Sequence, residues 1–116
     1  MGYRQLYERF EAKAADGREL PVEFRRAGFL TAGDNPELYF FQVGQKEVVV
    51  GISGGALKRA EQNRRFSREE KIDLAGLWLK RKIEAGAELE SKNLFLRDEE
   101  LARVAGELGI QGMAHR

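Results

Sequence analysis

Residues 9–15 and 20–24 alternate between apolar and polar side chains, a period of two that predicts β-strands. Asp16-Gly17 lies between the two segments and is typical of a tight turn, so together they predict a hairpin. Apolar residues between positions 3 and 14 also follow helical spacing, and a helix that stops at Gly17 is the alternative interpretation. We favour the strand for residues 9–15.

Two further apolar segments predict a second hairpin. Residues 38–43 and 48–50 are rich in aromatic and β-branched side chains, which suit the half-buried surface of a sheet. Gly44-Gln45 joins them as a turn. The three consecutive valines of the second segment favour a strand that is covered on both of its faces.

After Ile52 the hydrophobic period changes to that of a helix. Residues 54–62 predict a short helix, and Ser67-Arg68-Glu69-Glu70 has the sequence of a capping box at the start of a long one. We expect the long helix over residues 68–85, with Gly86 in the left-handed conformation at its end.

The last part of the chain predicts a loop followed by one more helix. A short strand is expected at 93–96, and Asp98 is the expected cap of a final helix that ends at Gly109. Residues 110–116 are expected to form a loose tail.

These elements predict an α+β fold, in which an antiparallel sheet of about four strands, formed by two hairpins, is followed by two or three helices packed on one face. The length suits one core, so residues 1–116 are expected to form a single domain with a hairpin sheet in 9–52 and a helical part in 53–109. The residues expected in the core are Leu20, Val22, Phe24, Phe41, Val49, Ile72, Leu79 and Ile83.

Composition and charge exclude several classes of protein. The sequence has no cysteine, which excludes disulfide scaffolds, thiolate metal sites and cysteine catalysis and fits a reducing compartment. A net charge of +1 predicts no global attraction to nucleic acid or to membranes. The longest uncharged run, 48–57, is ten residues and too short to cross a bilayer. We expect a cytoplasmic protein with no cofactor, no metal site and no membrane partner.

Gly51-Ile52-Ser53-Gly54-Gly55 fits the G-x-S-x-G pattern, which places a serine nucleophile on a strand-to-helix turn. Residues 51–57 resemble the nucleophile turn of patatin-like and other serine hydrolases, and the resemblance implies a hydrolase or acyl-transfer enzyme that uses Ser53. A nucleophilic serine also needs a base. The sole histidine, His115, is next to last in the chain, and no Asp-Gly pair follows the motif.

A structural role explains the same motif with fewer requirements. As the N-cap of the following helix, Ser53 would accept a hydrogen bond from a backbone amide. Gly54 and Gly55 are poor helix formers, so we expect a close backbone approach at these positions. A third interpretation is an anion or phosphate site built from Ser53, Gly54, Gly55, Lys58 and Arg59. We favour the cap.

A basic segment from Lys58 to Lys82 is the second candidate site. Residues 58–86 carry nine Lys and Arg against five Asp and Glu. On a helical wheel Trp78 lies among cations and away from the main apolar stripe, which suits the stacking of a base and the binding of phosphates. The candidate partner-binding residues are Arg64, Arg65, Arg68, Lys71, Trp78, Arg81 and Lys82.

Each feature of this segment has an alternative interpretation. The cations can form a solvated surface neutralised by neighbouring acids, and the last helix can cover Trp78. A homodimer seam through Trp78 is another alternative. Residues 98–110 resemble the first half of a helix-turn-helix unit, but too few residues follow for a recognition helix.

These observations predict a non-catalytic binding module. Its expected partner, nucleic acid or another protein chain, meets residues 58–82. A serine hydrolase that uses Ser53 is the alternative.

Overall fold

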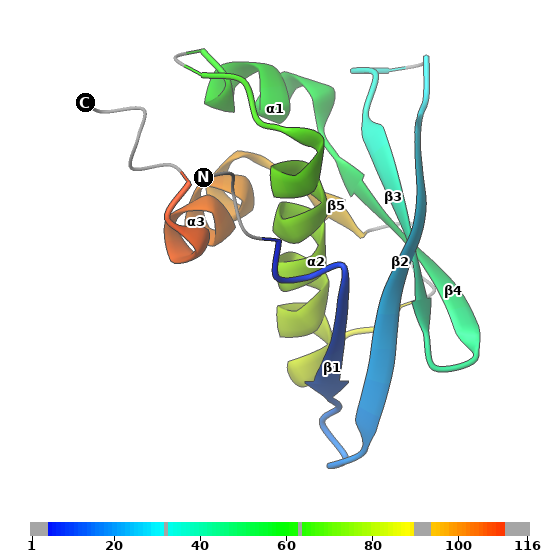
Figure 1. The fold of residues 1–116 in the computed structure, drawn as a ribbon. Coiled ribbons are helices and arrows are strands. Elements are labelled where there is room, and N and C mark those ends of the chain that lie inside the picture. The colour runs from blue at the N-terminus through cyan, green and yellow to red at the C-terminus, as the bar shows by residue number, and fades with distance from the viewer. Residues whose placement is uncertain (1–4, 32, 63, 90–93, 111–116) are drawn as a thin grey trace.

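The computed structural model describes residues 5–31, 33–62, 64–89 and 94–110. In this part of the chain a curled five-stranded sheet faces three helices, which lie together on one side of it (Figure 1). The strands are β1 Arg9–Lys13, β2 Glu19–Phe29, β3 Glu37–Val43, β4 Lys46–Ile52 and β5 Phe95–Leu96. The helices are α1 Gly54–Ala60, α2 Arg68–Glu84 and α3 Asp98–Leu108. Within the described ranges, no helix has the length and apolar character that a membrane span requires.

The sheet has the strand order β1-β2-β3-β4-β5. The first four strands are antiparallel, as the two predicted hairpins require. The fifth strand corrects the prediction, because β5 lies after α2 in the chain and pairs in parallel with β4. β5 thus adds a strand of the sheet from within residues 53–109, the part of the chain that was expected to be mainly helical. Of the strand expected at 93–96, only Phe95 and Leu96 are observed as strand, and Asn93 lies outside the described residues.

β2 is much longer than its neighbour β1. It has 11 residues, whereas β1 has five, and the β1–β2 ladder ends at the pair Arg9↔Glu23. A β-bulge follows between Phe24 and Arg26, and beyond it β2 continues alongside β3 as far as Phe29. The helical alternative for residues 3–14 is wrong in the part that β1 occupies.

The local capping signals of the long helix are confirmed. The Ser67 side chain accepts a hydrogen bond from the Glu70 amide at 3.1 Å, and the Glu70 carboxylate accepts one from the Ser67 amide at 2.8 Å. α2 ends at Glu84 and is followed by Gly86 with φ 78°.

The C-terminal end of α3 agrees with the prediction, and its N-terminal end does not. Gly109 has φ 75° and ends the helix as expected. At the start, Arg97 occupies the N-cap position without a side-chain cap bond, so the prediction of Asp98 as the cap is wrong. Ile110 is 2% exposed and donates its amide hydrogen to the Ala105 carbonyl at 3.0 Å, so the loose tail does not begin there. Residues 111–116, including His115, lie outside the described residues.

The core lies between α2 and the inner face of the sheet. Six predicted core residues are buried: Val22, Phe24, Phe41, Ile72, Leu79 and Ile83. Leu20 is only partly buried at the margin of the core. Val49 is 37% exposed, because β4 is covered on one face only and its side chain points to the other face, away from Val48 and Val50.

The segment before β1 is fixed to α2 by a buried carboxylate. Asp73 has no exposed surface and accepts hydrogen bonds from the backbone amides of Leu6 at 2.9 Å and Tyr7 at 2.8 Å. A Cβ at Gly76 would lie 2.7 Å from the Tyr7 Cβ, so only glycine allows this close approach. The N-terminal segment is therefore part of the packed structure from Leu6 onwards.

Candidate functional site

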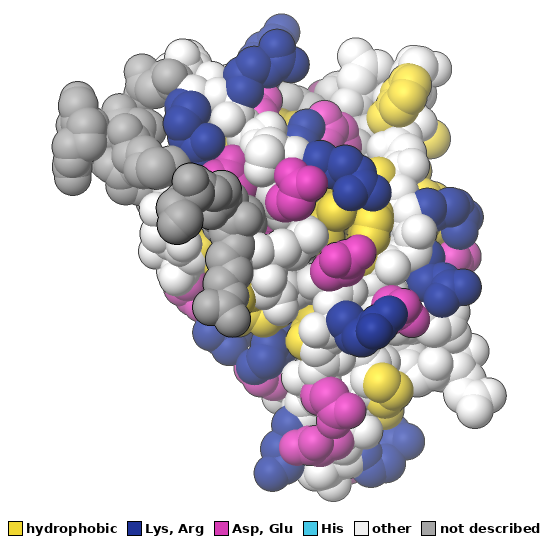
Figure 2. Space-filling view, viewed as in Figure 1, with side chains coloured by type: hydrophobic (Ala, Val, Ile, Leu, Met, Phe, Trp, Pro, Cys, Tyr) yellow, Lys and Arg dark blue, Asp and Glu magenta, His cyan; other side chains and the backbone are white. Residues whose placement is uncertain are grey.

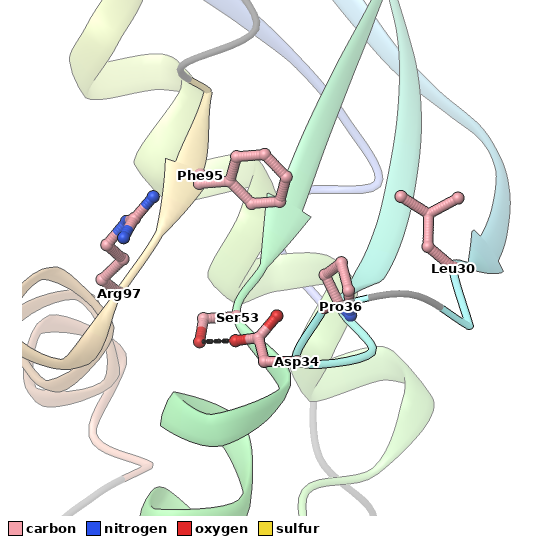
Figure 3. A pocket seen from close by; sticks show the side chains of 7 residues that line it. Leu30, Asp34, Pro36, Ser53, Phe95 and Arg97 are labelled. Carbon is pink, nitrogen blue, oxygen red and sulfur yellow. Dashed lines mark hydrogen bonds between the residues drawn. The ribbon is translucent and has the colours of Figure 1, made fainter.

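Ser53 joins β4 to α1 and makes two side-chain hydrogen bonds. Its Oγ accepts a hydrogen bond from the Ala56 amide at 3.2 Å, which confirms the predicted N-cap. The same hydroxyl donates a hydrogen bond to Asp34 Oδ2 at 2.5 Å (Figure 3). Ser53 therefore connects the start of α1 to the loop between β2 and β3.

Asp34 occupies the position at which an external anion was expected. Its Oδ2 also accepts a hydrogen bond from the Gly55 amide at 3.3 Å. The bond from Ser53, followed by the bond from Gly55, lowers the pKa of Asp34 below its usual value, so the carboxylate is ionised at neutral pH. A fixed negative charge at this turn opposes binding of phosphate and argues against the predicted anion site at Ser53, Gly54 and Gly55.

The glycines of the motif allow close packing. A Cβ at Gly54 would collide with the backbone oxygens of Asp34 and Asn35, so the expected close backbone approach is confirmed there. At Gly51 a Cβ would collide with the Phe95 ring, which lies against the strand. Gly55 is different, because a Cβ there would meet only the Arg59 guanidinium at 3.5 Å.

The chemistry around Ser53 does not suit nucleophilic attack. The lowered pKa of Asp34 makes this carboxylate a poor proton acceptor. One lone pair of the Ser53 hydroxyl is used by the Ala56 amide, and the Gly55 amide points to Asp34 instead of to an oxyanion position. No histidine is present in the part of the chain that the structure describes, since His115 lies outside it.

Sequence reasoning did not identify Asp34 as a partner of Ser53. The residue lies in the turn-rich segment 31–36, and its proximity to Ser53 depends on how the β2–β3 hairpin places that loop beside the end of β4. Only the concentration of turn formers was visible in the sequence.

A pocket of about 400 Å³ opens beside the Ser53 turn. Asp34 and Ser53 lie on one side of it, Phe95 and Arg97 come from β5 and the start of α3, and Leu30 and Pro36 complete the wall (Figure 3). Arg97 forms no ion pair with any residue in the described ranges.

Most cations of the basic segment are used in internal ion pairs. The shortest contacts of the six paired cations are Arg59–Asp98 at 2.7 Å, Arg64–Glu70 at 3.1 Å, Lys71–Glu37 at 3.2 Å, Lys80–Glu84 at 2.6 Å, Arg81–Glu107 at 2.8 Å and Lys82–Glu100 at 3.4 Å. Figure 2 shows basic and acidic side chains interspersed on the face in view. This arrangement favours the solvated, neutralised surface over a continuous phosphate-binding patch.

Three cations of the segment remain outside these pairs. Among the described residues, Lys58 and Arg65 have no ion-pair partner, and both line a shallow depression together with the carboxylates of Glu37 and Glu61. The Arg68 guanidinium lies 5.5 Å from the centre of the Phe24 ring on β2. Arg68 is thus the residue of the segment that lies beside the long strand.

Trp78 has no free face for a ligand. It is only 4% exposed and lies on α2, against which α3 packs. Its Nε1 is buried without an acceptor in the described ranges, and the Lys82 ammonium lies 5.1 Å from the ring centre. This burial argues against stacking of a base on Trp78 and against a dimer seam through it.

Part of the outer edge of β2 has no partner strand. The Phe24 amide donates to the Glu8 carbonyl at 2.8 Å, and beyond Phe24 no strand in the described ranges pairs with this side of β2. Leu30 donates its amide hydrogen to the Pro36 carbonyl at 3.0 Å, and the backbone direction alternates along an antiparallel ladder. The N–H and C=O groups of Ala27 and Phe29 therefore point away from β3. Phe29 and Leu30 are 69% and 47% exposed at the end of this edge.

Comparisons with known proteins give no relative from which a function could be inferred. No family model matches the chain, and no match is found among curated proteins or solved structures.

Proposed function

We propose that this chain is a non-catalytic binding module that binds an extended segment of another protein chain along the outer edge of β2. The observation that supports the proposal is the run Arg25–Phe29, which has a strand on one side only among the described residues and ends in the exposed side chain of Phe29. Unpaired backbone groups on a sheet edge are a template for an added strand.

Backbone pairing would supply the affinity of such a complex. Ala27 and Phe29 each direct one donor and one acceptor outwards, which is the spacing that an added antiparallel or parallel strand requires. The Phe29 side chain and the neighbouring Leu30 offer apolar contact at the end of the edge. A partner with an apolar residue at this position would bury both.

The charges beside the edge favour an acidic partner. The Glu23 carboxylate forms ion pairs with two arginines, since it lies 2.7 Å from the Arg9 guanidinium and 3.5 Å from the Arg25 guanidinium. Arg68 adds a third cation, with no ion pair to any described residue. An acidic side chain in the bound segment would meet this excess of positive charge.

A nucleic-acid partner has less support. Five of the candidate cations in residues 58–82 contact acidic side chains of the same chain, and Trp78 is buried. Release of counterions from phosphates needs cations that are not already neutralised. The hydrolase alternative also has less support, because Asp34 is a poor base for Ser53 and the Gly55 amide is bonded to Asp34.

A proline substitution tests the edge without breaking the sheet. In Ala27→Pro the lost N–H points away from β3, so the fold should remain while the edge can no longer pair. Glu11→Pro is the matched control, because Ala14 donates to the Arg18 carbonyl and the alternation along β1 directs the Glu11 N–H to the outer edge of that strand.

The probe is a random heptapeptide library displayed on phage. We expect selection to enrich peptides that combine β-branched or aromatic residues with Asp or Glu, and these peptides to bind the wild type and Glu11→Pro but not Ala27→Pro. Equal binding to all three proteins, or the absence of enriched peptides, would contradict the proposal. Binding of mixed-sequence single-stranded DNA that weakens steeply with salt would identify a nucleic-acid partner instead.

A further inference from the structure

We infer that the pocket beside the Ser53 turn binds a small zwitterion, namely a free α-amino acid with an apolar side chain. The site is separate from the outer edge of β2, although Leu30 lies at the border of both. The inference depends on two charges of opposite sign and three apolar side chains that line the same pocket.

The negative charge belongs to Asp34. The hydrogen bonds from Ser53 and Gly55 both end on Oδ2. The second oxygen, Oδ1, points toward the space between Phe95 and Pro36 (Figure 3). A carboxylate that is held by two hydrogen bonds on Oδ2 can accept a further hydrogen bond from a ligand ammonium group on Oδ1 without losing its position.

The positive charge belongs to Arg97, at the start of α3. Its side chain makes no cap bond, and it forms no ion pair with a described residue. Arg97 and Asp34 line the same pocket, and the Arg97 charge is the smallest of the causes that lower the pKa of Asp34. Its guanidinium has the donor geometry for two parallel hydrogen bonds to a ligand carboxylate.

Three other side chains that line the pocket are apolar. Leu30, Pro36 and Phe95 line the pocket, and the Phe95 ring is supported from below by Gly51, where a Cβ would collide with it. The volume of about 400 Å³ lies in the lower part of the range found for small-molecule sites. An amino acid with a branched aliphatic or aromatic side chain fits this combination of size and surface.

The balance of charge selects a zwitterion over a simple ion. An anion attracted by Arg97 is repelled by Asp34, and a cation attracted by Asp34 is repelled by Arg97. A ligand that carries an ammonium group and a carboxylate can pair with Asp34 and Arg97 at the same time.

A titration of the ¹⁵N-labelled chain with L-leucine, followed by NMR, tests the inference. We expect saturable shifts of the Ser53, Gly55 and Phe95 amide signals. N-acetyl-L-leucine lacks the ammonium group and leaves Asp34 without a partner, and L-leucinamide lacks the carboxylate and leaves Arg97 without one. Each compound should therefore bind at least about tenfold more weakly than leucine.

Two variants locate the site. Arg97→Ala should weaken leucine binding by about tenfold or more, since the carboxylate loses its partner. Arg103→Ala removes another exposed arginine of α3 and should leave the affinity unchanged. The absence of saturable shifts up to about 10 mM leucine would overturn the inference, because a specific pocket should bind at least this well.

Two further results would also overturn it. Equal affinity for either blocked compound would show that only one charge is recognised, and equal effects of the two arginine substitutions would place binding elsewhere. None of these results bears on peptide binding at β2, which the Ala27→Pro variant tests separately.

Discussion

The Ser53 hydroxyl donates a 2.5 Å hydrogen bond to Asp34 Oδ2 and accepts a hydrogen bond from the Ala56 amide. One side chain thus joins the β2–β3 loop to the first turn of α1. The G-x-S-x-G sequence is explained by this junction, in which Gly54 allows the loop backbone to approach and Gly55 donates to the same carboxylate. Gly51 and Gly54 are required for close packing, whereas position 55 contributes its backbone amide.

Removing the Ser53 hydroxyl should weaken the fold. Ser53→Ala loses the cap and the bond to Asp34, so we expect the free energy of unfolding to fall by about 1 kcal/mol, within the range measured for caps. Urea denaturation measures the change. Ser53→Thr keeps a hydroxyl at this position and serves as the control. An unchanged midpoint for Ser53→Ala would show that neither hydrogen bond contributes to stability.

The contribution of Asp34 to the stability of the fold should depend on pH. Its pKa is lower in the folded state than in the unfolded chain, so its stabilising effect is present above the unfolded pKa and is lost as pH falls through the folded pKa. The difference in stability between the wild type and Asp34→Asn should therefore be largest near neutral pH and shrink from about pH 4 downwards. Denaturation at a series of pH values measures this difference, and a constant difference would contradict the account of Asp34.

The two adjacent glycines of the motif should respond in opposite directions to alanine. Gly54→Ala forces a Cβ against the backbone oxygens of Asp34 and Asn35, and overpacking of this kind typically destabilises by about 1–3 kcal/mol. Gly55→Ala meets only a flexible arginine side chain and should stabilise the helix by up to about 1 kcal/mol. Thermal unfolding of both variants measures the contrast. The same sign for both variants would contradict the close approach at Gly54.

The buried indole Nε1 of Trp78 is absent from the smaller phenylalanine ring. The Trp78 Nε1 has no acceptor among the described residues, so Trp78→Phe eliminates an unsatisfied donor while keeping an aromatic ring. The gain of about 1–3 kcal/mol from the lost donor should offset much of the lost packing, and the net change should be within about 1 kcal/mol. Leu74→Ala, at a neighbouring buried position, should destabilise by about 2–5 kcal/mol. A similar loss for both variants in urea denaturation would argue that the Nε1 is satisfied in solution.

The parts of the fold that depend on local chemistry were predictable from the sequence. Ser67 and Glu70 carry their capping signal within one helical turn, and Gly86 and Gly109 end helices because glycine accepts the left-handed conformation. The cap at Ser53 was predictable for the same reason.

The parts that depend on distant residues were not predictable. Two residues of β5 carry too little pattern to reveal that they join β4 from beyond α2. The pairing of Asp34 with Ser53 spans 19 positions and depends on the placement of a whole hairpin. A run of valines shows that β4 is apolar but not which face is covered, and Val49 was assigned to the core for that reason.

Labelling with a fluorophosphonate probe tests most directly whether Ser53 is structural or catalytic. We expect the wild type to show no more labelling than Ser53→Ala, because the Ser53 hydroxyl is held between Ala56 and Asp34 and Asp34 is a poor base. A known serine hydrolase in the same assay confirms that the probe is active. Labelling of the wild type that disappears in Ser53→Ala would contradict the structural role of Ser53 and would support the hydrolase alternative.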